Sequence, residues 1–237
     1  DLRDYLEARG TDFLAEAQPD NIAWFLNVRG ADVDFNPMPQ SFLLAGRDGG
    51  VSWFVEAGKL EAGLRESLPD NVQICPPGDV LVTMRNLVSP GQRVLIDPDF
   101  SPVAFRQAFE AAGAQVLPEP GILTLTKAVK NPVELEGLRS CHVADGVAWT
   151  EFSAWLAETV PTRAAAGNPV SEREAEEKIL ELRRAQPGFL SESFNSISAA
   201  GGNAAMCHYA TTPERNAPVL PQNTYLLDSG GQYDTGT

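Results

Sequence analysis

The chain has 237 residues, which is enough for one large domain or two ordinary ones. An apolar share of 43% and a charged share of 21% are typical of a globular protein and argue against disorder. The formal net charge of −14 argues against nucleic-acid binding, because binding phosphates requires clustered Lys and Arg. No apolar run approaches the length of a bilayer span, and no secretory signal is visible, so no membrane partner is expected.

The cysteines favour a reducing compartment. Cys75, Cys141 and Cys207 are odd in number and widely spaced, with no metal-ligand spacing among them. We interpret all three as small buried apolar side chains and expect a cytoplasmic protein.

Residues 1–126 alternate between helix and strand patterns. Leu2, Tyr5 and Leu6 fall at helical spacing, and Gly10 is typical of a helix end. Further elements are expected as helices at 20–26, 58–68 and 101–113, and as strands at 41–44, 51–55, 72–75, 93–96 and 114–117. Turn residues between 44 and 51 predict that the first two of these strands form a hairpin. Helices interleaved with short strands imply a layered α/β domain.

The best linker candidate is the Pro- and Gly-containing segment 118–121. Near it we divide the chain into a first domain at 1–126 and a second domain at 127–237. From there on the sequence pattern changes towards long helices followed by short strands and Gly-rich loops.

Two capping boxes predict the helices of the second domain. Asn131 and Glu134 begin a helix that we expect to end before Pro161. Ser171 and Glu174 form the second box, which opens a helix through residue 182. We expect the acidic residues of the first helix to form a solvated face, with Asp145 among them.

Two later segments contain residues suited to chemistry. His208 follows the small-residue run 198–207, and Asp228 ends an apolar strand before a Gly-rich stretch at 229–237. Taken alone, each has an ordinary structural interpretation, as a surface histidine and as a turn carboxylate. The functional interpretation of Asp228 is a carboxylate held at a strand end, where a hard divalent cation can bind.

The order of the segments resembles a known family. Residues 227–237 read L-D-S-G-G-Q-Y-D-T-G-T, and residues 202–209 read G-N-A-A-M-C-H-Y. Together with K-A-V-K-N-P-V-E-L at 127–135 and N-I-A-W-F-L-N-V-R-G at 21–30, they resemble the proline-specific aminopeptidase branch of the creatinase-like, pita-bread metallopeptidases. The resemblance implies an α/β fold, with a creatinase N-terminal-like layered domain followed by the first half of a pita-bread α+β catalytic domain.

The resemblance also implies a chemistry. The family holds two divalent ions, commonly manganese, and a hydroxide bridging the ions attacks the carbonyl before a proline nitrogen. By motif position, Asp228 is a metal ligand, and His208 is a catalytic residue that contacts the substrate or the tetrahedral intermediate. The implied substrate is a peptide with proline in the second position, and the implied assembly is a homodimer.

The sequence departs from the family pattern at its end. The family's second ligating Asp, its ligating His and two Glu follow after the position of Thr237. We therefore expect four of the five metal ligands to be absent from this chain, which we interpret as a truncated and inactive piece of the enzyme.

Two alternatives remain open at this point. Some relatives keep the pita-bread fold without metal ligands and bind peptides or proteins. A prolidase or creatinase-type hydrolase would keep the fold and change the substrate, although the segment at 21–30 favours the aminopeptidase branch.

Overall fold

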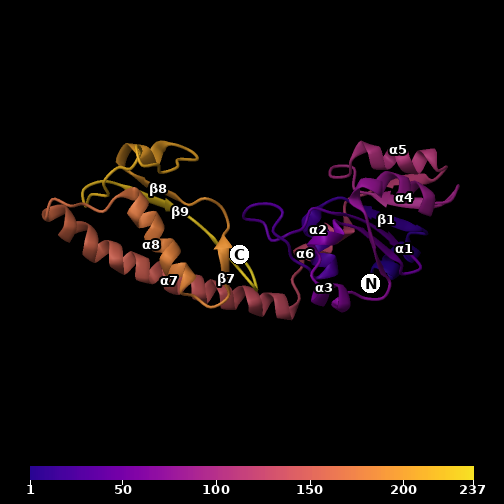
Figure 1. Cartoon of the computed structure of the whole chain (residues 1–237), viewed down its shortest axis with the longest axis horizontal. Helices are drawn as coiled ribbons and strands as arrows, with labels where there is room; N and C mark the ends of the chain where they lie inside the picture. The colour runs from indigo at the N-terminus through magenta and orange to yellow at the C-terminus, as the bar shows by residue number, and fades with distance from the viewer. The chain divides into compact units, whose positions relative to one another are not determined.

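The computed structural model describes the whole chain, residues 1–237. The chain divides into two compact units, Asp1–Val129 and Lys130–Thr237. Each unit is described by itself, and Figure 1 labels the elements of both.

A six-stranded mixed sheet forms the centre of the first unit. Its strands are β1 (Phe13–Glu16), β2 (Phe42–Gly46), β3 (Val51–Phe54), β4 (Val72–Cys75), β5 (Arg93–Ile96) and β6 (Gln115–Pro118), arranged in the order β4-β3-β2-β1-β5-β6. The expected hairpin is confirmed, because β2 and β3 pair antiparallel. β1 also pairs antiparallel with β2, whereas the β3–β4, β1–β5 and β5–β6 pairs are parallel.

Helices cover both faces of this sheet. They are α1 (Leu2–Ala8), α2 (Pro19–Leu26), α3 (Ala62–Ser67), α4 (Val80–Leu87), α5 (Val103–Ala111) and α6 (Ile122–Ala128), with short 3-10 turns η1 (Ala57–Lys59) and η2 (Pro77–Asp79). α4 and α5 lie on one side of the strands, and α1, α2, α3 and α6 lie on the other (Figure 1). Leu43 and Leu44 are adjacent on β2 and belong to opposite core clusters, as the alternation of side chains along a strand requires.

Two expectations for the first unit are corrected. The helix expected over 58–68 is interrupted, because Leu60 is buried in an extended conformation between η1 and α3. The linker candidate at 118–121 lies within the first unit, which extends to Val129. The N–H of Gly121 donates to Asp97 at 2.7 Å, and Leu123 of α6 packs into the core of the first unit.

Two helices and two short β-ribbons make up the second unit. They are α7 (Pro132–Ala165), α8 (Glu172–Arg184), β7 (Phe189–Glu192), β8 (Ile197–Ala200), the 3-10 turn η3 (Gly201–Ala205), β9 (Tyr225–Asp228) and β10 (Gly231–Tyr233). β8 pairs antiparallel with β9, and β7 pairs antiparallel with β10. Phe152 of α7 and Ile179 of α8 are fully buried in one core cluster with Ala200 of β8.

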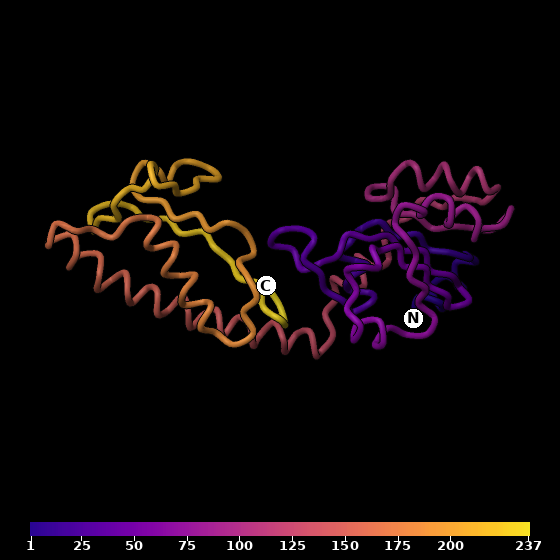
Figure 2. The backbone as a smooth tube through the Cα atoms, viewed as in Figure 1, coloured from indigo at the N-terminus to yellow at the C-terminus, as the bar shows by residue number.

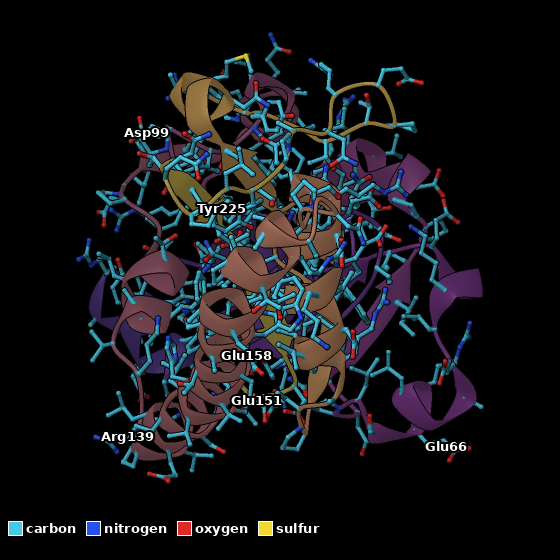
Figure 3. The ribbon with its side chains drawn as sticks, turned by 90° about the vertical axis from the view of Figure 1, so that its left-hand side faces the viewer. Glu66, Asp99, Arg139, Glu151, Glu158 and Tyr225 are labelled. Carbon is cyan, nitrogen blue, oxygen red and sulfur yellow. The ribbon has the colours of Figure 1, made fainter.

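The chain's last residues return to α7. Figure 2 shows this C-terminal segment beside the N-terminal half of the helix, and the Thr235 hydroxyl donates to the Gly137 carbonyl at 3.1 Å. Figure 3 labels Glu151 and Glu158, which are exposed along α7. It also labels Tyr225 of β9, which is half-buried.

α7 is longer than expected. The capping box at its start is confirmed, because Asn131 and Glu134 exchange hydrogen bonds of 2.8 and 2.9 Å. The helix then continues through Pro161 to Ala165. Pro161 removes one backbone donor from the helix. The residue before it, Val160, is buried in the core, and this packing stabilises the helix across the proline.

The second capping box forms only in part. Ser171 accepts a hydrogen bond from the N–H of Glu174 at 3.2 Å, as expected for an N-cap. The Glu174 side chain instead forms an ion pair with Arg163 of α7. The Glu174 carboxylate therefore binds the Arg163 guanidinium and not the Ser171 N–H that the predicted capping box requires.

Candidate functional site

Asp228 is the last residue of β9. It pairs with Ile197 at one end of the β8–β9 ribbon, and its side chain is exposed. Ser229 and Gly230 then connect β9 to β10. A Cβ at Gly230 would lie 2.1 Å from the Ser193 hydroxyl oxygen, so any larger residue at this position would require the Ser193 side chain to move. The fold thus presents the Asp228 carboxylate to solvent at the end of β9, just before the short link to β10.

His208 lies in the loop that follows η3, and its side chain is exposed. Its backbone φ is +54°, in the left-handed region that non-glycine residues rarely occupy. Such a conformation costs about 1–3 kcal/mol and persists only where the surrounding structure fixes it.

Glu172 fixes that loop. It is the first residue of α8 and has 0% exposure. Its Oε1 accepts from the Ala200 N–H at 2.6 Å and from Asn203 Nδ2 at 2.9 Å. Its Oε2 accepts from the Tyr209 hydroxyl at 2.7 Å and from the Ala217 N–H at 2.8 Å. Two of these donors, Asn203 and Tyr209, lie on either side of His208 in sequence.

These contacts set the ionisation of the buried groups. Burial alone would raise the pKa of Glu172, but the hydrogen bonds from Ala200, Tyr209, Asn203 and Ala217 outweigh it and hold that pKa below its usual value. Burial and the bond to the Glu172 carboxylate raise the pKa of Tyr209 to about 12. At neutral pH, Glu172 is therefore a charged acceptor and Tyr209 a protonated donor.

A second buried network supports the segment that bears Asp228. Arg183 of α8 has 1% exposure, and its Nε donates to Asp145 Oδ1 of α7 at 2.8 Å. The Tyr233 hydroxyl donates to the same Asp145 oxygen at 2.9 Å, and Arg183 Nη2 approaches the Ser229 carbonyl at 3.4 Å. The segment after Asp228 is thereby tied to both helices.

The structure does not join the two predicted site residues. No hydrogen bond or ion pair links His208 to Asp228. The His208 loop leaves the ribbon at its Ala200–Tyr225 end, whereas Asp228 lies at the Ile197 end. No group of three His, Cys, Asp or Glu side chains gathers in a way that could hold a metal ion.

Sequence reasoning missed the residues that support the site. Glu172 lies within the predicted helix-capping pattern at 171–174, and no sequence pattern shows that its side chain accepts from Asn203 and Tyr209. The expectation that Asp145 is solvated is wrong, because Asp145 pairs with the buried Arg183. The expectation of a buried Cys207 is also wrong, since Cys207 is exposed beside His208, while Cys75 and Cys141 are buried.

Comparison with solved structures supports the fold. An X-prolyl aminopeptidase from Caenorhabditis elegans, described as a cytosolic enzyme with a di-nuclear active site, matches 98% of this chain and 38% of its own, with a TM-score of 0.86 and 29% identity. An Xaa-Pro dipeptidase from Bacillus anthracis matches with a TM-score of 0.66 at 18% identity, over 98% of this chain and 59% of its own, which shows the fold alone. None of the helices combines the length and apolar character that a membrane span requires.

Comparison with curated sequences agrees. Xaa-Pro aminopeptidase 1 of Dictyostelium discoideum is 32% identical over 237 residues, and Xaa-Pro aminopeptidase ApepP of Drosophila melanogaster is 31% identical over 240. Both alignments cover 100% of this chain, but only 37% and 38% of the relatives. The chain thus spans less than half the length of these proteins.

Family models match nearly every residue. The Creatinase/Prolidase N-terminal domain matches residues 1–134, and Metallopeptidase family M24 matches residues 136–237. The expected fold class is confirmed, with a layered α/β domain of the creatinase N-terminal type followed by part of a pita-bread domain. The chain belongs to the creatinase/prolidase family, and its second unit matches metallopeptidase family M24.

Proposed function

We propose that the whole protein containing this chain is a metal-dependent Xaa-Pro aminopeptidase, which removes the N-terminal residue from peptides with proline in the second position. The observation that carries this proposal is the match of the entire chain to relatives named Xaa-Pro aminopeptidase. The Caenorhabditis elegans structure that matches this chain with a TM-score of 0.86 is also an X-prolyl aminopeptidase. Both units take part in these matches, so the proposal does not depend on one short motif.

In this proposal, Asp228 is one ligand of a centre with two divalent ions, and manganese is the metal that its oxygen-rich ligation favours. The support is the position of Asp228 as an exposed carboxylate at a strand end within the part matched by family M24. The proposed chemistry is attack by a metal-activated hydroxide on the carbonyl before the proline nitrogen.

We assign His208 to the substrate side of the reaction. Its imidazole is exposed on a loop that Glu172 fixes on both sides, so it is available to contact a bound peptide. A positioned imidazole stabilises developing oxyanion charge or transfers a proton. This role differs from that of Asp228, whose proposed function is to hold metal.

We also propose a cytoplasmic homodimer. The free cysteines suit a reducing compartment, and the Caenorhabditis elegans neighbour is described as cytosolic. The 237-residue chain on its own is proposed to be inactive, because a single carboxylate does not hold two hydrated cations. Tight binding of two manganese ions to this polypeptide in calorimetry would contradict that statement.

Peptide hydrolysis by the whole protein tests the proposal. The enzyme is stripped with a chelator, reconstituted with manganese, and assayed on two peptides that differ only in proline or alanine at the second position. We expect release of the first residue from the proline peptide alone, and only with metal present. Cleavage that is equal for both peptides, or that survives metal removal, would refute the assignment.

A further inference from the structure

The acceptor capacity of Glu172 is completely used. A carboxylate offers about four acceptor sites, and Glu172 receives four donors, two on each oxygen. Each donor comes from a different part of the chain that follows α8, at Ala200, Asn203, Tyr209 and Ala217. One buried charge therefore joins the start of α8 to the end of β8 and to both sides of the His208 loop.

Apart from Glu172, few contacts hold the loop: Asn203 Nδ2 also donates to the Tyr209 hydroxyl oxygen at 3.0 Å, and that hydroxyl lies 3.3 Å from the Arg215 carbonyl oxygen. Between Asn203 and Tyr209, the side chains of Met206, Cys207 and His208 are exposed. The Met206 N–H donates to the Asn203 carbonyl at 3.0 Å, so this contact also depends on how Asn203 is held. The left-handed backbone of His208 lies one residue before Tyr209, which is buried. The position of the imidazole thus depends on the two anchors that end on Glu172.

We infer that Glu172 is a positioning residue, which holds the His208 loop in its substrate-facing conformation through the bonds to Asn203 and Tyr209. The expected effect on catalysis rests on the proposed function, in which His208 contacts the substrate. The anchoring of the loop by Glu172 does not depend on that function. The negative charge is the required property. An amide in its place would present N–H groups to two of the four donors and leave them unpaired.

The test compares Glu172→Gln with Glu174→Gln in the whole protein. Glu174 lies on the same turn of α8 and pairs with Arg163, so the control makes the same chemical change and breaks an ion pair without touching the loop. A second control, Ser171→Ala, removes the helix cap and lowers stability while leaving Glu172 charged. Tyr209→Phe removes one donor and serves as the milder variant if Glu172→Gln folds poorly.

Two readings are taken on each variant. We expect Glu172→Gln to lose about 10- to 100-fold in kcat/KM on the proline peptide with its metal content unchanged, because small displacements of a catalytic group have effects of this size. Tyr209→Phe should show a smaller loss, and the two controls should stay within about twofold of wild type. Hydrogen exchange of the amides at 201–209 should accelerate in Glu172→Gln and Tyr209→Phe only.

The two readings separate this inference from the proposed function. Unchanged exchange in Glu172→Gln, or a kcat/KM loss matched by Ser171→Ala or by lost metal, would overturn the positioning role. Absence of turnover in the wild type would defeat the proposed function, while the exchange data would still decide whether Glu172 anchors the loop.

Discussion

At the scale of single residues, His208 and Asp228 are both exposed, but the fold fixes them in different ways. His208 depends on side-chain hydrogen bonds to Glu172 made by its neighbours, Asn203 and Tyr209. Asp228 is fixed by the backbone pairing of β9 with β8. Substitutions at the two positions should therefore produce different defects.

Replacement of His208 by Ala in the whole protein should leave folding and metal content intact. The side chain is exposed and makes no hydrogen bond or ion pair within the chain, so its loss removes no packing. If the imidazole stabilises the transition state, kcat should fall by about 10²–10³. Steady-state kinetics with metal analysis would measure this. A fully metallated His208→Ala protein with wild-type turnover would exclude His208 from the mechanism.

Glu172 should make stability depend on acid. Its pKa in the folded state lies below the usual 4.5, which is the value it regains on unfolding. The charged carboxylate therefore stabilises the fold above pH 4.5, and this contribution is lost as the pH falls through the lower folded-state pKa. The gap in melting temperature between wild type and Glu172→Gln should shrink as the pH is lowered from neutral to well below 4.5. A constant gap would contradict this account.

At the scale of elements, the second unit is joined by buried polar contacts as well as by its apolar core. Asp145 of α7 pairs with Arg183 of α8 and accepts from Tyr233 of β10. Such a pair need not add net stability compared with apolar side chains, but breaking it leaves a charge buried without its partner. The pair thus fixes which faces of α7 and α8 meet.

Asp145→Ala should therefore be strongly destabilising. It leaves Arg183 charged at 1% exposure, and removing one partner of a buried pair typically costs about 3–5 kcal/mol. The matched control is Glu177→Ala, which breaks the exposed pair with Arg173 on α8 and should change stability by less than about 1 kcal/mol. Denaturant melts of both variants give the comparison. Similar small effects would show that the Asp145 pair is unimportant.

The elements could be predicted from local patterns where local physics decides them. The strands at 72–75 and 93–96 and the capping box at Asn131 were predicted correctly. The errors occurred where contacts from elsewhere in the chain override local preference. Core packing stabilises α7 beyond Pro161. The ion pair with Arg163 prevents the Glu174 side chain from forming its predicted capping bond.

At the scale of the whole molecule, the chain is two units, each with its own core. The motifs predicted the fold class, but the order of the six strands in the first sheet could not be read from them. Neither could the burial of Glu172 and Arg183, because charged residues on a helix usually face solvent. Such residues become recognisable only when the donors and acceptors they meet are known.

The second unit leaves apolar side chains uncovered. Val133 is 81% exposed and Val143 69%, and Val147 lies one helical turn after Val143 on α7. We expect the 237-residue polypeptide made alone to self-associate, because large exposed apolar patches promote association. Sedimentation at several concentrations would show this. A stable monomer with a single cooperative melt would count against it.

The most direct test of the central claim is the metal content of the whole protein, wild type against Asp228→Asn. We expect two manganese ions per wild-type subunit, a clear drop in occupancy for Asp228→Asn, and loss of proline-peptide cleavage in parallel with the metal. The substitution keeps the shape of the side chain and removes the ligand charge, so the effect should appear in metal affinity before stability. Full occupancy and full turnover in Asp228→Asn would contradict the account.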